Sequence, residues 1–506
     1  MKNDITRNTF DPVKHFSRVL MQQGRVQLDA DWNEQASILL RYLRLLAADV
    51  IGAAGGPRAA SGFELVIDES RLDQLISDLS KEEKDRLREL LKKQKLLLSP
   101  GRYYVDGWLV ENESFVSFFH QPHFRRHGNA DELKNRIKEK GSQLLYLDVW
   151  ERHVTFIEDD SIREKALGGP DTDTATRAQV VCRVRARELT DDEKNASNQS
   201  TCVAIKAGWE KWKRTQTANR GKLRAKVMEE EESEDPCIAS AESTYRGVEN
   251  QLYRIEIHNG GEPWDGKDED TAAKSASFKW SRDNGSVVAV WLEQDGNTLS
   301  FRGVHDQTRG FSSGQWIELS DDLREIKGSH GLFVQVTKVE GDKLTIDPHN
   351  GAMNRADFAD TATARRWDQQ ETDETKLYKG VIPIVEGEWF TLEDGVQVYF
   401  EPAANGTPNH YHTGDYWLIP ARVETKNIEW PQELDDEGKT KKDAKDHTIP
   451  AAVAPRGVTH HYGPLGILSV STQDAFKFED CRCRFDPLHC AYGYSFGGEG
   501  IGTDLL

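Results

Sequence analysis

Long hydrophobic runs are missing from this sequence of 506 residues. No apolar segment approaches the roughly 20 residues that a membrane-spanning helix needs. The first seven residues, Met1 to Arg7, also lack the apolar core of a signal peptide. We therefore expect synthesis in the cytoplasm without a signal peptide and without membrane insertion.

Positive charge is also in deficit. The chain has 66 Lys and Arg against 85 Asp and Glu, which gives a formal net charge of −19. An acidic excess of this size repels nucleic acid and anionic membrane surfaces and supports solubility. We expect no nucleic-acid partner.

Cysteine is scarce, with six residues in the whole chain, which is too few for a disulfide scaffold. Three of the six lie close to a histidine in one short segment, as Cys481, Cys483, His489 and Cys490. Thiolates and imidazole suit tetrahedral zinc, although Cys-x-Cys spacing differs from the Cys-x-x-Cys knuckle. The segment is compatible with a zinc or iron site, with free thiols, or with a disulfide. Reduced thiols are the default for a chain made in the cytosol.

Several catalytic motifs are absent: a phosphate-binding Walker loop, a dinucleotide fingerprint, a Gly-x-Ser-x-Gly elbow and a His-Glu-x-x-His helix. We expect no catalytic residues. A pair of carboxylates for glycoside hydrolysis stays open, because the separation of such a pair depends on the fold. The carboxylates in strand-like contexts are Glu242, Glu249, Glu256, Asp283 and Asp415. Ion pairs with neighbouring arginines are the structural alternative for each of them.

An apolar helix is predicted near the N-terminus. Asp31 or Asn33 can cap a helix that begins near Glu34, and Gly52 can end it. Within this helix the spacing alternates between three and four residues, which places one set of apolar side chains on a single face: Leu39, Leu43, Leu46 and Val50. This face either packs inside its own domain or forms an oligomer interface on a symmetry axis. We expect the preceding Trp32 to be buried, with fixed partners for its polar neighbours.

Strand patterns dominate the rest of the chain. Asp106-Gly107 predicts a tight hairpin turn, and so do Asn284-Gly285 and Asp295-Gly296. Ser80 and Glu83 form a capping box within a charged helical segment at 71–95. The sequence predicts a mainly β protein with a helical N-terminus and helical insertions (α+β), built from β-sandwich or barrel-like modules.

We divide the chain into five consecutive segments. They are an N-terminal docking or oligomerisation segment with a helix (1–60), a first β module with a helical insertion (61–190), a charged insertion (191–243), a central β module (244–425) and a C-terminal segment with the Cys/His cluster (426–506). The charged insertion runs from a basic half with two tryptophans into an acidic run, and such charge runs are usually solvated.

A combination of motifs spread over most of the chain carries a family resemblance. The motifs are Gly24-Arg-Val-Gln-Leu-Asp-Ala-Asp-Trp-Asn-Glu-Gln35, Tyr146-Leu-Asp-Val-Trp-Glu-Arg152, Phe278-Lys-Trp-Ser-Arg-Asp-Asn-Gly285, Gly414-Asp-Tyr-Trp417 and His460-His-Tyr-Gly-Pro464. In these motifs the chain resembles an uncharacterised domain family that is encoded with phage tails and phage-tail-like contractile injection systems.

The resemblance implies a structural component at the baseplate end of a contractile tail-like particle, as a fibre-, spike- or cage-like accessory. Implied partners are its own copies, as a homotrimer, and the baseplate, spike or sheath proteins. The particle would carry the protein out of the cell. The family has no established catalytic residues to transfer.

Two other functions remain open. A tail-associated glycan-binding protein or glycoside hydrolase could use aromatic faces for sugar stacking, although burial in a core is the alternative for them. The tryptophans concerned are Trp108, Trp150, Trp280, Trp291 and Trp417. A free cytosolic metalloprotein built on the Cys481–Cys490 segment is the third function.

Overall fold

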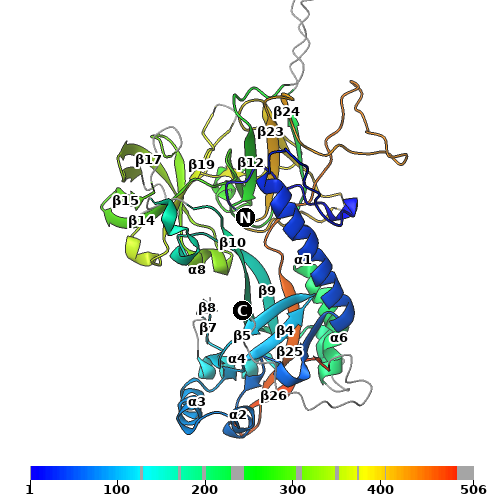
Figure 1. Ribbon diagram of the computed structural model, residues 1–506, viewed down its shortest axis with the longest axis vertical. Helices are drawn as coiled ribbons and strands as arrows, with labels where there is room; N and C mark the ends of the chain where they lie inside the picture. The colour runs from blue at the N-terminus through cyan, green and yellow to red at the C-terminus, as the bar shows by residue number, and fades with distance from the viewer. Residues whose placement is uncertain are drawn as a thin grey trace, which may run out of the picture. The chain divides into compact units, whose positions relative to one another are not determined.

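The computed structural model describes residues 2–486 except 123, 126–128, 169–172, 196–200, 229–243, 304–309, 348–352, 373–374 and 405. The described chain is mainly β, with a smaller helical content (Figure 1), which confirms the predicted fold class. It forms two compact units. Unit 1 contains Met1–Ser37, Glu151–Gln179 and Thr217–Thr459, and unit 2 contains Ile38–Trp150, Val180–Gln216 and His460–Leu506.

The units are interleaved along the chain. The predicted first β module, 61–190, contributes to both units, because residues 151–179 of it belong to unit 1. The main segment of unit 1 lies between two segments of unit 2. The five consecutive segments stay a prediction. The central β module, 244–425, lies within unit 1, and each of the other four segments contributes residues to both units.

Unit 1 contains a closed barrel of six strands, so one barrel-like module is confirmed. Around the barrel the strands are β14 (Val288–Asp295), β15 (Thr298–Arg302), β18 (Lys343–Asp347), β17 (Leu332–Glu340), β16 (Trp316–Ser320) and β19 (Thr363–Trp367). Trp291, Phe301 and Ile317 are among the side chains that fill its core. Closure leaves the barrel without an unpaired edge strand. The short helix α8 (Asp322–Lys327) follows β16.

A five-stranded sheet and a three-stranded sheet complete unit 1. The first has the order β20 (Ile382–Pro383), β13 (Ser277–Ser281), β12 (Gln251–Ile257), β23 (Tyr416–Arg422), β24 (Asn427–Ile428), and the second has the order β11 (Leu223–Val227), β22 (Val396–Phe400), β21 (Trp389–Thr391). Phe278, Phe400 and Trp417 lie in the core cluster to which both sheets contribute. The short helix α7 (Glu269–Ala272) lies between β12 and β13.

The predicted hairpin at Asn284-Gly285 is wrong, although the turn is present. Both residues have positive φ angles, 51° and 64°. However, β13 pairs with β12 and β20, and β14 pairs with β15 and β19. Because both edges of β13 are already occupied, the turn leads from the sheet into the barrel. The hairpin predicted at Asp295-Gly296 is confirmed by the pairing of Asp295 with Thr298.

Three sheets lie wholly or mainly in unit 2, and two strands of one of them continue into unit 1 at residues 151–154 and 177–179. The first sheet has the order β27 (Arg484–Phe485), β1 (Ala54–Pro57), β4 (Gly101–Val105), β5 (Trp108–Asn112). The second has the order β10 (Arg177–Glu188), β9 (Gln143–Val154), β25 (His461–Val470), β26 (Phe476–Asp480). The third has the order β2 (Leu65–Val66), β3 (Leu97–Leu98), β6 (Val116–Ser117), β7 (His120–Gln121), β8 (Phe124–Arg125). Tyr103, Phe118 and Leu147 are among the core residues of unit 2. The Asp106-Gly107 turn joins β4 to β5, with φ angles of 49° and 81°, as predicted.

Helices of unit 2 follow local sequence signals. The segment at 71–95 forms the pair α2 (Glu69–Leu75) and α3 (Lys81–Gln94), and the capping box of Ser80 and Glu83 is present at the start of α3. Asn129 caps α4 (Ala130–Lys140). None of the described helices combines the length and the apolar content needed to cross a membrane.

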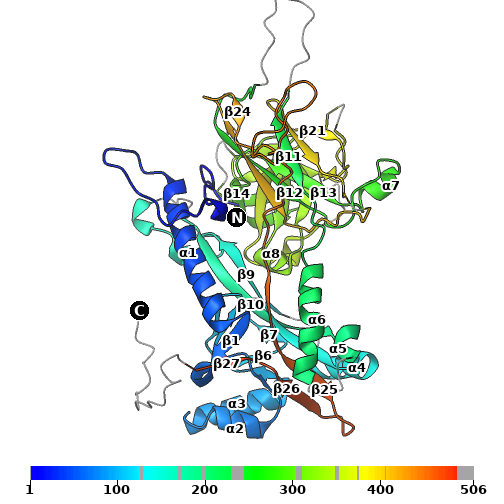
Figure 2. The ribbon, with the colours of Figure 1, turned by 90° about the vertical axis from the view of Figure 1, so that its right-hand side faces the viewer.

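The predicted solvated insertion is wrong over its described part. It contains α5 (Asp191–Asn195) and α6 (Thr201–Thr215), and α6 lies beside β25 and β26 (Figure 2). Ile205 and Trp209 on α6 are buried against Leu144, Tyr146 and Ile467. The two apolar side chains, one helical turn apart, give this charged helix an inner face that its charge pattern concealed. β11, from the same predicted insertion, is a strand of unit 1.

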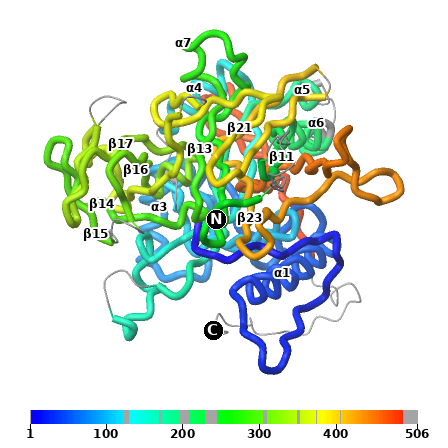
Figure 3. The backbone as a smooth tube through the Cα atoms, turned by 90° about the horizontal axis from the view of Figure 1, so that it is seen from above, coloured from blue at the N-terminus to red at the C-terminus, as the bar shows by residue number. Residues whose placement is uncertain are grey.

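The N-terminal helix α1 (Asp29–Ile51) begins earlier than predicted, so Asp31 and Asn33 lie inside it and do not cap it. Both carboxylate oxygens of Asp29 accept hydrogen bonds from Thr6, one from its backbone N–H and one from its hydroxyl. An acidic side chain at this position also favours the start of a helix. Before α1, the chain runs as an irregular loop that leads back to the helix (Figure 3). Gly52, with φ +92°, ends the helix as predicted.

The expected burial of Trp32 is wrong, because this residue is 68% exposed. Among its polar neighbours, Asp29 is paired with Thr6 and Asn33 is exposed, so neither requires a buried environment.

Candidate functional site

A stripe of large apolar side chains is exposed along α1. Leu39, Leu43, Leu46 and Val50, the predicted oligomer-interface residues, are 53%, 62%, 62% and 57% exposed. We call these four residues the α1 stripe. Their spacing of four, three and four residues places them on one side of the helix. In the described chain these side chains are therefore not part of a hydrophobic core.

The other side of α1 explains why the stripe faces outward. Ile38 is buried, and the Arg44 guanidinium lies 3.3 Å from the ring centroid of Trp108. Gly107, in the β4–β5 turn, approaches the backbone of Arg44 so closely that a Cβ atom there would overlap its carbonyl oxygen. All these residues belong to unit 2. One side of α1 thus packs against the β4–β5 hairpin.

The irregular segment before α1, which belongs to unit 1, is also rich in exposed apolar residues. They are Val13, Phe16, Leu20, Met21, Val26 and Leu28. Single exposed apolar residues are ordinary on protein surfaces, but a concentration of them indicates an interaction surface.

The predicted metal ligands are placed differently from the expectation. Cys481 forms a disulfide with Cys202, with 5.4 Å between the two Cα atoms. Cys483 is an exposed free thiol, and His489 and Cys490 lie outside the described residues. The structure therefore joins Cys481 to a partner 279 residues away, at the start of α6. Nothing in the spacing of Cys202 indicated this pairing.

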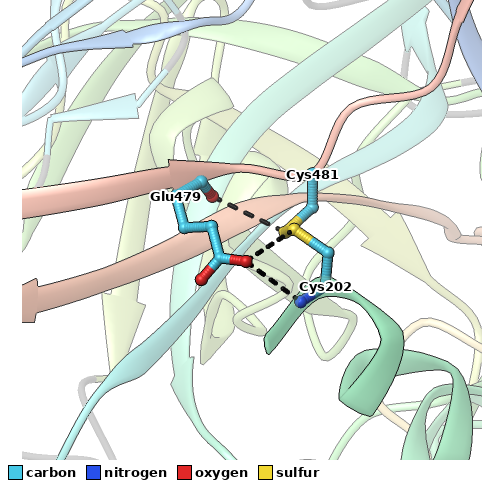
Figure 4. Close-up of side chains that lie close together, drawn as sticks. All are labelled: Cys202, Glu479 and Cys481. Carbon is cyan, nitrogen blue, oxygen red and sulfur yellow. Dashed lines mark hydrogen bonds between the residues drawn. A yellow bond between two sulfur atoms is a disulfide. The ribbon is translucent and has the colours of Figure 1, made fainter. Parts of the chain in front are cut away.

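A carboxylate accompanies the disulfide (Figure 4). Glu479, on β26, lies with Oε1 3.2 Å from the Sγ of Cys202, and the same oxygen accepts a hydrogen bond from the Cys202 backbone N–H at 3.3 Å. The ligand atoms of Cys202, Glu479 and Cys481 all lie within 4.8 Å of one another. We call these three residues the Cys–Glu cluster.

A second polar centre of unit 2 surrounds Asp148, which is completely buried. His460 Nδ1 lies 2.5 Å from Asp148 Oδ1, and Arg183 Nε and Arg185 donate to Oδ2 at 3.1 and 3.2 Å. Burial alone raises the pKa of Asp148, but the hydrogen bond from His460 and the charges of His460, Arg183 and Arg185 outweigh it and lower the pKa. The next histidine, His461, pairs with the more exposed Asp106 at 3.2 Å.

A buried charge network lies in unit 1. Lys279, which is 2% exposed, places Nζ 2.6 Å from Glu318 Oε2 and 3.2 Å from Glu256 Oε1. Arg254 and Lys2 also contact Glu256, at 2.6 and 3.3 Å. Burial raises the pKa of Glu256, but the charges of Lys2, Arg254 and Lys279 hold it well below its usual value.

Three of the five carboxylates considered for hydrolysis are engaged in ion pairs. Glu256 belongs to the buried network, Asp283 pairs with Arg366 at 2.5 Å, and Asp415 pairs with Arg220. Glu249 is exposed, and Glu242 lies outside the described residues. For Glu256, Asp283 and Asp415 this arrangement agrees with the alternative to hydrolysis, in which the carboxylates form ion pairs with neighbouring basic residues.

The tryptophans considered for sugar stacking are mostly in cores. Trp150, Trp280, Trp291 and Trp417 are buried. The Arg44 guanidinium lies over the ring of Trp108. Four of the five rings are therefore core residues, and Arg44 covers one face of the fifth.

The sequence matches a family described as a family of unknown function, DUF6519, over residues 1–207 and 190–498. No curated protein and no solved structure matches the chain. Because the family match spans well over half of the sequence, the protein belongs to DUF6519, a family of unknown function.

Proposed function

We propose that this protein is a structural component of a phage-tail-like contractile injection particle, at its baseplate end, and that it assembles as a homotrimer through the α1 stripe. The observation that carries the proposal is the exposure of Leu39, Leu43, Leu46 and Val50 on a helix whose other side is seated on the β4–β5 hairpin. The resemblance of the motifs to proteins encoded with contractile tails supports the particle as the site of assembly.

Energetics favour burial of the stripe against another helix. Full burial of a Leu or Val side chain contributes about 1.5–3 kcal/mol relative to exposure. The four side chains are already about half covered, so roughly half of that contribution is available for each of them. The alternation of three- and four-residue spacings is the geometry by which helices of separate chains pack together. A second copy of this chain, offering the same stripe, is therefore a matching partner.

The trimer is tested by measuring the mass of the purified full-length chain. Multi-angle light scattering at micromolar concentration should give three times the chain mass of 57.3 kDa. The variant Leu43→Glu/Leu46→Glu should be monomeric and folded, with unchanged far-ultraviolet circular dichroism, because both side chains are 62% exposed in the single chain. Its melting temperature should be lower than that of the trimer, since association stabilises the folded state. The matched control Leu292→Glu/Leu323→Glu changes two other exposed leucines and should stay trimeric. A monomeric unmodified protein would contradict the homotrimer.

Membership of a particle needs a separate measurement. Contractile particles purified from a producing strain should contain the protein by immunoblot, and the Leu43→Glu/Leu46→Glu variant should be lost from them. Particles that lack the unmodified protein, together with sugar release by the isolated chain, would instead favour the tail-associated glycan hydrolase. Specific binding on a glycan array without sugar release would favour the glycan-binding alternative.

A further inference from the structure

We infer that, once its disulfide is reduced, the Cys–Glu cluster binds a thiophilic divalent cation such as Zn²⁺ through Cys202, Glu479 and Cys481. The site differs from the one predicted from the sequence, with which it shares only Cys481. It is also independent of the proposed assembly, because none of its residues lies on α1.

Geometry places the three donors within reach of one ion. Their ligand atoms lie within 4.8 Å of one another. Zinc bonds of about 2.3 Å to sulfur and about 2.0–2.2 Å to oxygen join ligand atoms that are roughly 3.5–4 Å apart in a tetrahedron. After the S–S bond opens, the two sulfurs reach this separation by rotation of their side chains. The Cα atoms, 5.4 Å apart, need not move far.

Packing keeps the donors in place after reduction. Ile205 and Trp209 hold α6 against Tyr146 and Ile467 in a hydrophobic cluster, which adds to the contact made by the disulfide. Glu479 is fixed in β26 by its pairing with Ile467 on β25. The cluster is therefore presented by two elements that stay together, which lowers the entropy loss on ion binding.

Electrostatics favour the anionic forms of the ligands. Cys202 is the second residue of the 15-residue helix α6, and its backbone N–H already donates to the Glu479 carboxylate. The N-terminus of a helix stabilises thiolates and carboxylates. Two thiolates and one carboxylate then face each other, and a divalent cation is the species that offsets their mutual repulsion. All three residues are at least partly exposed, so an ion can enter.

A dithiol reductant supplies the electrons that open the disulfide. The Cys202–Cys481 bond accepts two electrons and two protons and becomes two thiols, and the dithiol is oxidised to its own disulfide. Zn²⁺ then replaces the two thiol protons, which are released to water. Glu479 supplies the third ligand, and water fills the fourth position.

Cobalt titration tests the inference on the full-length chain. The protein is reduced with dithiothreitol, desalted without oxygen and titrated with Co²⁺. The reduced protein should bind one equivalent, with a sulfur-to-cobalt charge-transfer band that Zn²⁺ abolishes. Cys202→Ser and Cys481→Ser should lack the band. Glu479→Gln, which keeps both cysteines and the possible disulfide, should bind at least about ten-fold more weakly.

The matched control is the triple variant Cys483→Ser/His489→Ala/Cys490→Ser, which removes the other predicted ligands and should retain the band. Melting temperatures show that each variant is folded. The inference is overturned if the triple variant loses the band, since the sequence-predicted ligands then bind the metal. It is also overturned if the oxidised protein binds equally well, if Glu479→Gln binds with unchanged affinity, or if the reduced protein shows no band.

Discussion

Asp148 is a fully buried carboxylate that receives hydrogen bonds from two arginines and lies against His460. Removing one member of a buried charge group leaves the others without compensation, which typically costs about 3–5 kcal/mol. We expect Asp148→Asn to lower the free energy of unfolding by about 3 kcal/mol in urea denaturation, because the buried Arg183 then loses the carboxylate to which its Nε donates.

Asp106 provides the matched control for this measurement. It makes the same kind of contact with the adjacent histidine, but its side chain is 33% exposed. Exposed pairs contribute about 1 kcal/mol or less. Equal losses of unfolding free energy for Asp148→Asn and Asp106→Asn would contradict the inference that burial makes the Asp148 contacts more costly to break.

Acid should destabilise the protein through Glu256. Its pKa is well below its usual value in the folded chain, whereas an unfolded Glu has a pKa of about 4.3. Below that unfolded value the unfolded chain binds the proton more readily, so the stability contributed by Glu256 is present above about pH 4.3 and is lost as the pH falls toward the folded pKa.

Urea denaturation of the wild type between pH 6 and pH 3 should therefore show a steep loss of stability. Glu256→Gln, already weaker at neutral pH, should show a shallower loss over the same range. Parallel curves for the two proteins would show that other carboxylates carry the acid sensitivity.

At the level of elements, the packing of α1 against the β4–β5 turn depends on the absence of a side chain at position 107. Gly107 has φ +81° and lies against the Arg44 carbonyl. We expect Gly107→Ala to displace α1 from the β4–β5 turn and to reduce stability by more than the ~1 kcal/mol of left-handed backbone strain. Gly328→Ala is the control, since Gly328 is left-handed with φ +69° and no atom lies near the added Cβ. Similar melting temperatures of the two variants would contradict the claim that α1 packs closely against the turn at Gly107.

Two elements specified by neighbouring residues were predicted correctly from the sequence. The Asp106-Gly107 hairpin and the Ser80 capping box depend on contacts within a few residues, and both are present. Asn284-Gly285 has the predicted turn conformation, but whether its flanking strands pair depends on competition from distant strands. The predicted hairpin was wrong for that reason.

In the candidate site, too, features set by nearby residues were predicted, whereas features that depend on distant contacts were not. Helical spacing identified Leu39 and Leu43 as members of one face, but spacing alone cannot tell a face covered by the protein's own core from an exposed one. The contact of Cys202 with Cys481 spans 279 residues and follows from the packing of α6 beside β26. Packing of this kind depends on the whole fold, and no local pattern encodes it.

At the scale of the whole molecule, the disulfide closes a very long loop. A cross-link over 279 residues stabilises the folded chain by up to about 5 kcal/mol in the chain-entropy description, because it restricts the unfolded state. We expect reduction, or the variant Cys202→Ser, to lower the melting temperature measured without metal. Cys483→Ser removes a free thiol and should leave the melting temperature unchanged.

The connectivity of the two units also has a consequence for protease treatment. The largest segment of unit 1, Thr217–Thr459, lies entirely between Cys202 and Cys481 in the chain. A single nick in that segment yields two fragments that remain covalently joined through sulfur. Gel electrophoresis would therefore show one full-mass band without reductant and two smaller bands after reduction, even for a molecule whose backbone is no longer continuous.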